Sequence, residues 1–159
     1  MKQIVLILVI GINFTSCKQS KVNGITIGTT LYENQTFEEN QELRKLVRQT
    51  LNKDQNALVK LNDFWCGEGA GCYDLGFIVT QIVYQLGEND FNTMLKKIEA
   101  KHFAGLESLI RVGLEYGDNN QDGKMDNKKF ETEFPELLNI LNTKKQEEKP
   151  NHQPILLQR

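Results

Sequence analysis

The sequence predicts an all-α fold, an irregular bundle or an array of helical hairpins with about five helices. The first observation is that apolar residues from Leu43 onward recur at spacings of three, four and seven, the period of an amphipathic helix. The second is that short glycine-rich or polar turns separate these apolar segments, as they do between antiparallel helices. The helical domain is expected to span residues 37–143.

The first apolar stripe runs from Leu43 to Trp65. It predicts one amphipathic helix, or two with a break at residues 52–56. The glycine-rich segment 66–72 should end this helix and lead the chain into the next.

The segment 73–86 is apolar on most sides, which predicts a helix buried on most faces. Gly87 follows it where a C-terminal cap is expected. Asn89 or Asp90 should then cap a short helix whose apolar residues lie between positions 91 and 98.

Two further helices are predicted after residue 100. The apolar spacing between residues 103 and 114 indicates an amphipathic helix that ends near residues 116–117. A last helix is expected over residues 130–141, where Pro135 must either start the helix or kink it. Residues 144–159 are charged and proline-containing, which predicts a disordered tail.

The N-terminus has the features of a secretory signal peptide. A basic Met1-Lys2 precedes an apolar run over residues 4–12, which is too short to span a bilayer. The run ends in small residues before Cys17, and this end resembles the lipobox of bacterial lipoproteins. Thr15 and Ser16 fit that pattern, whereas Phe14 departs from its usual aliphatic residue.

The resemblance implies that residues 1–16 are removed and that Cys17 carries lipid as the first residue of the mature chain. The protein would then be attached to a membrane of the bacterial cell envelope, on the periplasmic side or at the cell surface. An ordinary cleaved signal with an incidental cysteine is the alternative. Residues 17–36 are expected to form a flexible tether with a reach of about 25 Å, although residues 24–28 could form a short strand.

Charge and cysteine content limit the classes of partner. With 19 basic and 21 acidic residues and no basic stripe, the chain is not expected to bind nucleic acid. Cys66 and Cys72 form an even pair in an oxidising compartment, which favours a disulfide worth about 2 kcal/mol. Two reduced thiols or a metal pair are the alternatives.

The segment 118–126 resembles an EF-hand or dockerin-type calcium loop, in which alternating oxygen ligands wrap around one ion. The resemblance implies side-chain ligands at positions one, three and five, a glycine at position six, a carbonyl ligand at seven, an apolar residue at eight and a water-mediated ligand at nine. In order, these positions are held by Asp118, Asn120, Asp122, Gly123, Lys124, Met125 and Asp126.

The loop departs from the pattern at position twelve, where Lys129 replaces the bidentate carboxylate. Glu131 and Glu133 come two and four residues too late. Calcium is therefore expected to bind weakly, with a Kd of about 10⁻⁴–10⁻³ M, in a structural role that joins the last helix to the one before it. A polar turn without metal is the alternative.

No recognisable catalytic set is present, so the sequence favours a binding or structural role in the envelope, with a protein partner. One alternative is a small envelope enzyme that uses the Cys66–Asp74 turn, with Glu68, Trp65 or His102 contributing. Another is an inhibitor or immunity-type protein that occludes an enzyme.

Overall fold

The computed structural model describes residues 21–67 and 69–147, and this part of the chain is mostly helical. The all-α prediction is confirmed, but the expected number of about five helices is too low. Besides the short 3₁₀ helix η1 (Ala100–His102), the described residues form α1 (Thr29–Asn34), α2 (Phe37–Leu51), α3 (Gln55–Asn62), α4 (Ala70–Leu86), α5 (Glu88–Leu95), α6 (Phe103–Tyr116), α7 (Phe130–Glu133) and α8 (Pro135–Glu147).

Two of the additional helices arise from breaks within predicted stripes. Helix α3 restarts after α2 because the Asp54 side chain accepts hydrogen bonds from the N–H groups of Asn56 (2.9 Å) and Ala57 (3.3 Å). The last stripe divides into α7 and α8 at Pro135, which has no N–H to donate and is best tolerated at the start of a helix.

The remaining additional helix, α1, lies in the segment that was predicted to be a tether, and that prediction is wrong for residues 21–36. Strands β1 (Lys21–Val22) and β2 (Ile25–Thr26) form an antiparallel hairpin before α1. The aliphatic side chains of Val22, Ile25, Ile27 and Leu31 are buried in the core, which holds this polar-looking segment against the domain. Residues 17–20 lie outside the described part.

The Gln81 side chain adds hydrogen bonds between the hairpin and α4 to this apolar packing. Gln81 accepts a hydrogen bond from the N–H of Thr26 (2.8 Å) and donates one to the carbonyl of the same residue (3.0 Å). The amide therefore takes the place of a further strand beside β2.

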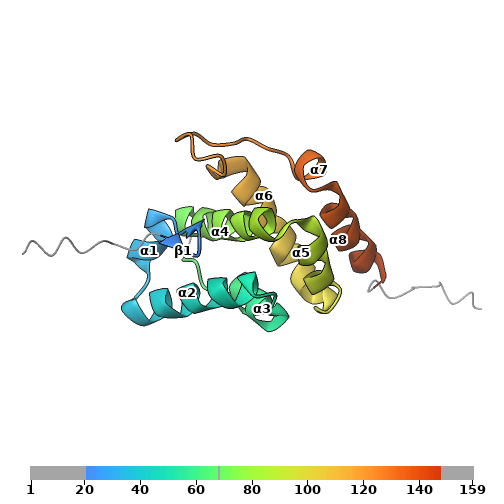
Figure 1. Cartoon of the computed structure of the whole chain (residues 1–159), viewed down its shortest axis with the longest axis horizontal. Coiled ribbons are helices and arrows are strands. Elements are labelled where there is room, and N and C mark those ends of the chain that lie inside the picture. Colours follow the sequence, from blue (N-terminus) through green and yellow to red (C-terminus); the bar gives the residue numbers. More distant parts are fainter. Residues whose placement is uncertain (1–20, 68, 148–159) are drawn as a thin grey trace, which may run out of the picture.

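Helices α4 and α6 form an antiparallel pair at the centre of the molecule (Figure 1). Their contacts occur in opposite chain order, with the Tyr73 ring on Tyr116, Gly76 against Gly113, and the Thr80 hydroxyl donating to the carbonyl of Ile110. The two glycines let the backbones meet, because a Cβ on Gly113 would lie 2.2 Å from the carbonyl oxygen of Gly76.

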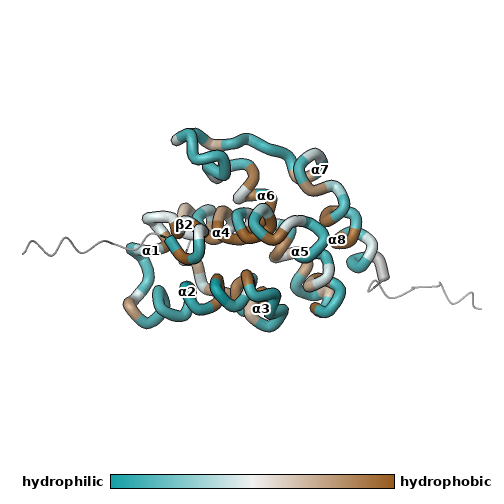
Figure 2. Tube along the Cα trace, in the orientation of Figure 1, coloured by the Kyte–Doolittle hydropathy of each residue, from teal (hydrophilic) through white to brown (hydrophobic). Residues whose placement is uncertain are grey.

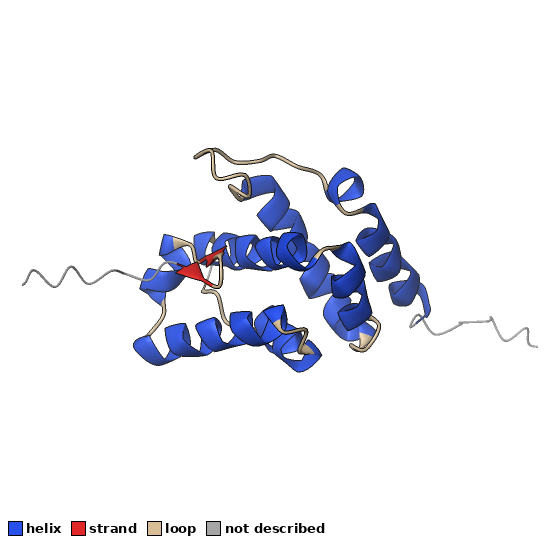
Figure 3. Ribbon diagram, in the orientation of Figure 1, coloured by secondary structure: helices blue, strands red, loops and turns tan. Residues whose placement is uncertain are grey.

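The other helices surround this pair (Figure 3). Helices α2 and α3 lie along one side, α1 covers the first turns of α4, and α5 and α8 lie at the opposite end of the long axis from β1 and α1. The apolar residues gather on α4 and on the faces turned toward it (Figure 2). Among the described helices, none is long and apolar enough to cross a membrane.

Helix boundaries also differ from the predicted ones, and α4 begins at Ala70, inside the predicted turn 66–72. Helix α5 begins at Glu88 directly after Gly87, so neither Asn89 nor Asp90 caps it. Helix α8 continues to Glu147, so residues 144–147 are helical where a disordered tail was predicted. The rest of that predicted tail, residues 148–159, lies outside the described part.

Candidate functional site

The loop between α6 and α7 folds around its own polar side chains. The Asp118 carboxylate accepts hydrogen bonds from the N–H groups of Asp122 and Gly123, both at 2.9 Å. Asn120 Oδ1 accepts from the N–H of Asp122 (3.1 Å), and Asp122 Oδ1 accepts from the N–H of Lys124 (2.9 Å). The three side chains predicted at loop positions one, three and five therefore all turn back onto the backbone of the same loop.

The buried side chain of Asp126 links the end of the loop to its beginning at Asn119. This side chain is fully buried, and its Oδ2 accepts hydrogen bonds from the backbone N–H of Asn119 (3.0 Å) and from Asn119 Nδ2 (2.8 Å). The backbone N–H of Asp126 donates to the carbonyl of Gly117 (2.9 Å). The other carboxylate oxygen, Oδ1, has no hydrogen-bond partner among the described residues, and a buried acceptor in that state would be satisfied by a cation or a water molecule.

The two late carboxylates do not replace the missing ligand at position twelve. Glu131 pairs with the Arg111 guanidinium at 2.8 Å. Glu133 accepts a hydrogen bond from the Tyr84 hydroxyl (2.6 Å) and lies 3.6 Å from the ammonium of Lys128. Both side chains are therefore engaged in contacts outside the loop.

The loop residues fit calcium only in part. Within residues 21–67 and 69–147, no three acidic, histidine or cysteine side chains converge on a metal position, so an amide and a carbonyl would have to contribute. Asp118, Asn120 and Asp122 can each offer a side-chain oxygen and Lys124 its carbonyl, which is short of the six to eight oxygens that calcium takes. Water would have to complete the shell, as it does in weak sites. Met125, expected at the apolar position eight, is 61% exposed and does not join the core.

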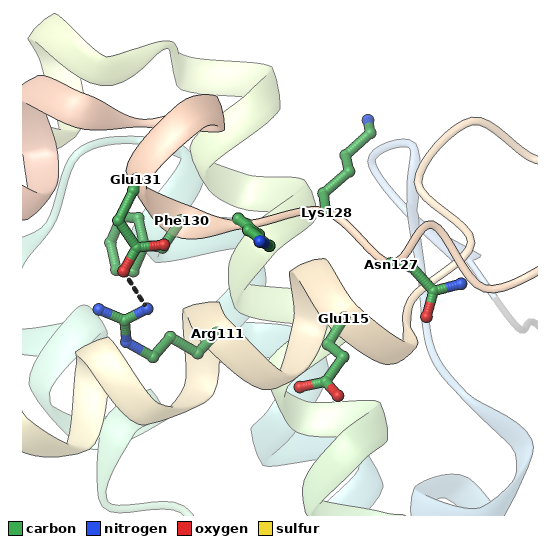
Figure 4. Close-up of a pocket in the computed structure, with 7 residues that line it drawn as sticks. Arg111, Glu115, Asn127, Lys128, Phe130 and Glu131 are labelled. Carbon is green, nitrogen blue, oxygen red and sulfur yellow. Dashed lines mark hydrogen bonds and ion pairs between the residues drawn. The ribbon is translucent and has the colours of Figure 1, made fainter.

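A pocket of about 340 Å³ lies beside the loop, at the junction of α6 and α7 (Figure 4). Arg111 lines this pocket, and its guanidinium also bonds Glu107 (3.0 Å) and lies 5.4 Å from the centre of the Phe130 ring. Burial alone would lower the pKa of Arg111, but its hydrogen bonds to Glu131 and Glu107 outweigh burial and raise the pKa. The lining residues are Arg111, Glu115, Asn127, Lys128, Lys129, Phe130 and Glu131.

Sequence reasoning did not find this pocket, because its residues come from two segments that are separated by the loop and show no motif. The ion pair of Arg111 with Glu131 joins α6 to α7. It therefore holds the loop between these two helices at both ends.

Tyr84 makes a second connection of this kind, from α4 to the segment 128–134 that contains α7. Its hydroxyl donates to Glu133 and accepts from the Lys128 ammonium (3.1 Å), and its ring lies 4.9 Å from the Phe134 ring in an edge-on geometry. Burial, followed by the hydrogen bond to Glu133, raises the pKa of Tyr84 well above its ordinary value. The Tyr84 hydroxyl therefore stays protonated and acts as a structural donor.

The predicted bond between Cys66 and Cys72 is confirmed: the two residues form a disulfide, with Cα atoms 4.9 Å apart. Two glycines in the intervening turn have positive φ angles, Gly67 at 73° and Gly69 at 69°. A Cβ on Gly71 would lie 2.2 Å from the carbonyl oxygen of Cys66, so the turn closes tightly on itself.

Asp74, a candidate for the alternative enzyme, instead caps α1. Its Oδ2 accepts a hydrogen bond from the N–H of Leu31 (2.9 Å), and α1 has no side-chain cap of its own. Gly28 precedes the helix, and a Cβ there would lie 1.9 Å from the Asp74 carboxyl carbon. Burial raises the pKa of Asp74, although the N–H groups of Leu31 and Thr30 act in the opposite direction.

The other residues considered for catalysis lie in different surroundings. His102 Nδ1 is 3.4 Å from a carboxylate oxygen of Asp63 and faces a pocket of about 450 Å³ between α3 and the segment after α5. Trp65 is 64% exposed. Glu68 and Cys17 lie outside the described residues. The described side chains proposed for catalysis at the Cys66–Asp74 turn therefore do not share one pocket.

No family model matches the chain, and no curated protein or solved structure is similar to it at a significant level.

Proposed function

We propose that the protein is a lipid-anchored component of the bacterial cell envelope, with a helical domain that has a binding or structural role and one weak calcium site in the loop 118–126. The anchor is the lipid on Cys17, and its support is the lipobox-like end of the N-terminal apolar segment. The calcium site is proposed to order the connection between α6 and α8.

The observation that carries the calcium proposal is the inward fold of the loop. Asp118, Asn120 and Asp122 already turn their side-chain oxygens toward the loop backbone, and one oxygen of the buried Asp126 is without a donor. A cation in the loop would add attraction for three aspartates that otherwise repel one another. Because Lys129 supplies no carboxylate, the expected Kd is about 10⁻⁴–10⁻³ M.

Calorimetric titration of residues 18–159 with calcium tests this site. We expect saturable binding that Asp122→Ala abolishes, because that substitution removes a direct ligand. The substitution Lys129→Glu should tighten binding, since it restores the carboxylate at position twelve. Lys124→Glu is the matched control: it makes the same charge change in the same loop but supplies no carboxylate at position twelve.

If Lys129→Glu and Lys124→Glu tightened calcium binding equally, the gain would come from the change in charge and not from a carboxylate at position twelve. No heat of binding at millimolar calcium in any variant would contradict the calcium site. The anchor is tested separately by fractionation, where Cys17→Ala should move the protein out of the membrane fraction. Unchanged membrane partitioning of Cys17→Ala would refute lipidation.

A further inference from the structure

Four of the five large aromatic side chains that are exposed among the described residues belong to elements that lie toward the end of the molecule where the described chain begins. Their exposed fractions are 72% for Phe37, 64% for Trp65, 45% for Tyr73 and 41% for Tyr116. We call this set the aromatic end. Side chains of this size are costly to expose to water, so a concentration of them on one region indicates a surface that binds something.

A ring contact and the disulfide connect Trp65, Tyr73 and Tyr116, and a hydrogen bond brings the segment before Phe37 to Trp65. The rings of Tyr73 and Tyr116 are stacked, with centroids 4.8 Å apart. Trp65 and Tyr73 directly flank the disulfide, whose Cα atoms are 4.9 Å apart. The carbonyl of Trp65 accepts a hydrogen bond (2.9 Å) from Gln35, two residues before Phe37. The start of α2, the start of α4 and the end of α6 accordingly lie toward the same end of the long axis (Figure 1).

The described chain also begins at this end. Strand β1 lies beside α1 there (Figure 1), and the ammonium of Lys21 is 3.4 Å from Oε1 of Gln121, which follows Tyr116 by five residues. Only three residues separate Cys17 from Lys21. Four Cα-to-Cα steps span at most about 14 Å, so lipid on Cys17 would hold this end against the headgroups.

We propose that the aromatic end of the domain docks on the lipid bilayer in which the Cys17 lipid is anchored. This inference rests on the lipidation in the proposed function and adds which face of the domain meets the membrane. The bilayer is favoured over a protein partner because the attachment point is too near to let this face turn freely into solution. Tryptophan and tyrosine, three of the four side chains, suit a membrane interface, where the ring enters the apolar boundary and the polar atom stays hydrated.

The test uses Trp65, the only tryptophan of the chain, as the probe. The full chain is purified from bacterial membranes, its lipid is verified by mass spectrometry, and it is reconstituted in phosphatidylcholine–phosphatidylglycerol vesicles with brominated acyl chains. We expect the Trp65 emission to shift to shorter wavelength and to lose most of its intensity, because bromine quenches indole only at close range.

A matched control moves the probe to the other end of the molecule. Helix α5 lies there (Figure 1), and the exposed Lys97 follows it by two residues. The double variant Trp65→Phe/Lys97→Trp, reconstituted in the same vesicles, should keep its emission unquenched. Equal quenching of both probes would mean that the domain has no fixed orientation and would overturn the proposal.

The remaining outcomes distinguish a failure of docking from a failure of lipidation. Unquenched Trp65 in a chain whose Cys17 carries lipid would overturn docking and leave the anchor intact. A chain without lipid on Cys17 would overturn both. A shift of Trp65 emission that needs added envelope proteins, and is absent in pure lipid, would assign the aromatic end to a protein partner instead.

Discussion

The substitution Gly113→Ala should destabilise the domain because it increases the separation of its two central helices, α4 and α6. A Cβ on Gly113 would lie 2.2 Å from the carbonyl oxygen of Gly76 and 2.3 Å from the hydroxyl of Thr80. The first of these is backbone, so rotating a side chain cannot relieve it, and α4 must move away from α6. Overpacking of this kind typically lowers the free energy of unfolding by about 1–3 kcal/mol. Because the contact is with backbone, we expect Gly113→Ala to lie at the upper end of this range. The higher helix propensity of alanine returns about 1 kcal/mol, which leaves a net loss of about 2 kcal/mol.

Urea unfolding followed by circular dichroism at the helix band measures this loss. The matched control is Gly105→Ala in the same helix, where the new Cβ would lie 2.5 Å from Asn62 Oδ1, the end of a side chain that can rotate away. We expect Gly105→Ala to stay within about 1 kcal/mol of the wild type. If Gly113→Ala were as stable as Gly105→Ala, the close approach of α4 and α6 would be refuted.

Three further predictions concern the disulfide and the cap of α1. Replacing both Cys66 and Cys72 by serine should lower the free energy of unfolding by about 2 kcal/mol. A reductant should lower the urea midpoint of the wild type but not that of the variant. A wild-type midpoint that the reductant leaves unchanged would contradict the disulfide. Asp74→Ala should cost about 1 kcal/mol by leaving the first N–H groups of α1 without an acceptor. The raised pKa of Asp74 means that its contribution to stability is full below its ordinary pKa of 3.8 and is lost as pH rises through the folded-state pKa. Asp74→Asn should therefore gain stability relative to wild type between about pH 3 and about pH 7 in urea titrations, and a constant difference would argue against burial of the charge.

The elements that could be predicted from the sequence are those that depend on near neighbours in the chain. The helical stripes of α2, α4 and α6 are visible because residues three and four apart share a face. The disulfide is predictable because Cys66 and Cys72 are six residues apart and leave no other pairing once Cys17 is set aside. The loop 118–126 shows its motif for the same local reason, and its affinity for calcium stays a prediction.

The predictions from the sequence were wrong where residues distant in the chain decide the local structure. Residues 21–36 look like a tether because Thr, Asn, Gly and Lys dominate them, yet Val22, Ile25 and Leu31 find a core supplied by other helices. In the proposed lipid-anchored protein, that change would shorten the reach of the domain from the membrane and would bring the aromatic end within range of the headgroups.

The sequence by itself determined the helical class, the stripes of the longer helices and the disulfide, since each is set by periodicity or short separation along the chain. Only the tertiary structure decided that Asp74 caps α1, that Gly76 and Gly113 bring α4 and α6 together, and that four exposed aromatic residues gather where the described chain begins. These features join residues that are tens of positions apart. They depend on how the helices pack against one another, which is settled only once the helices have been assembled.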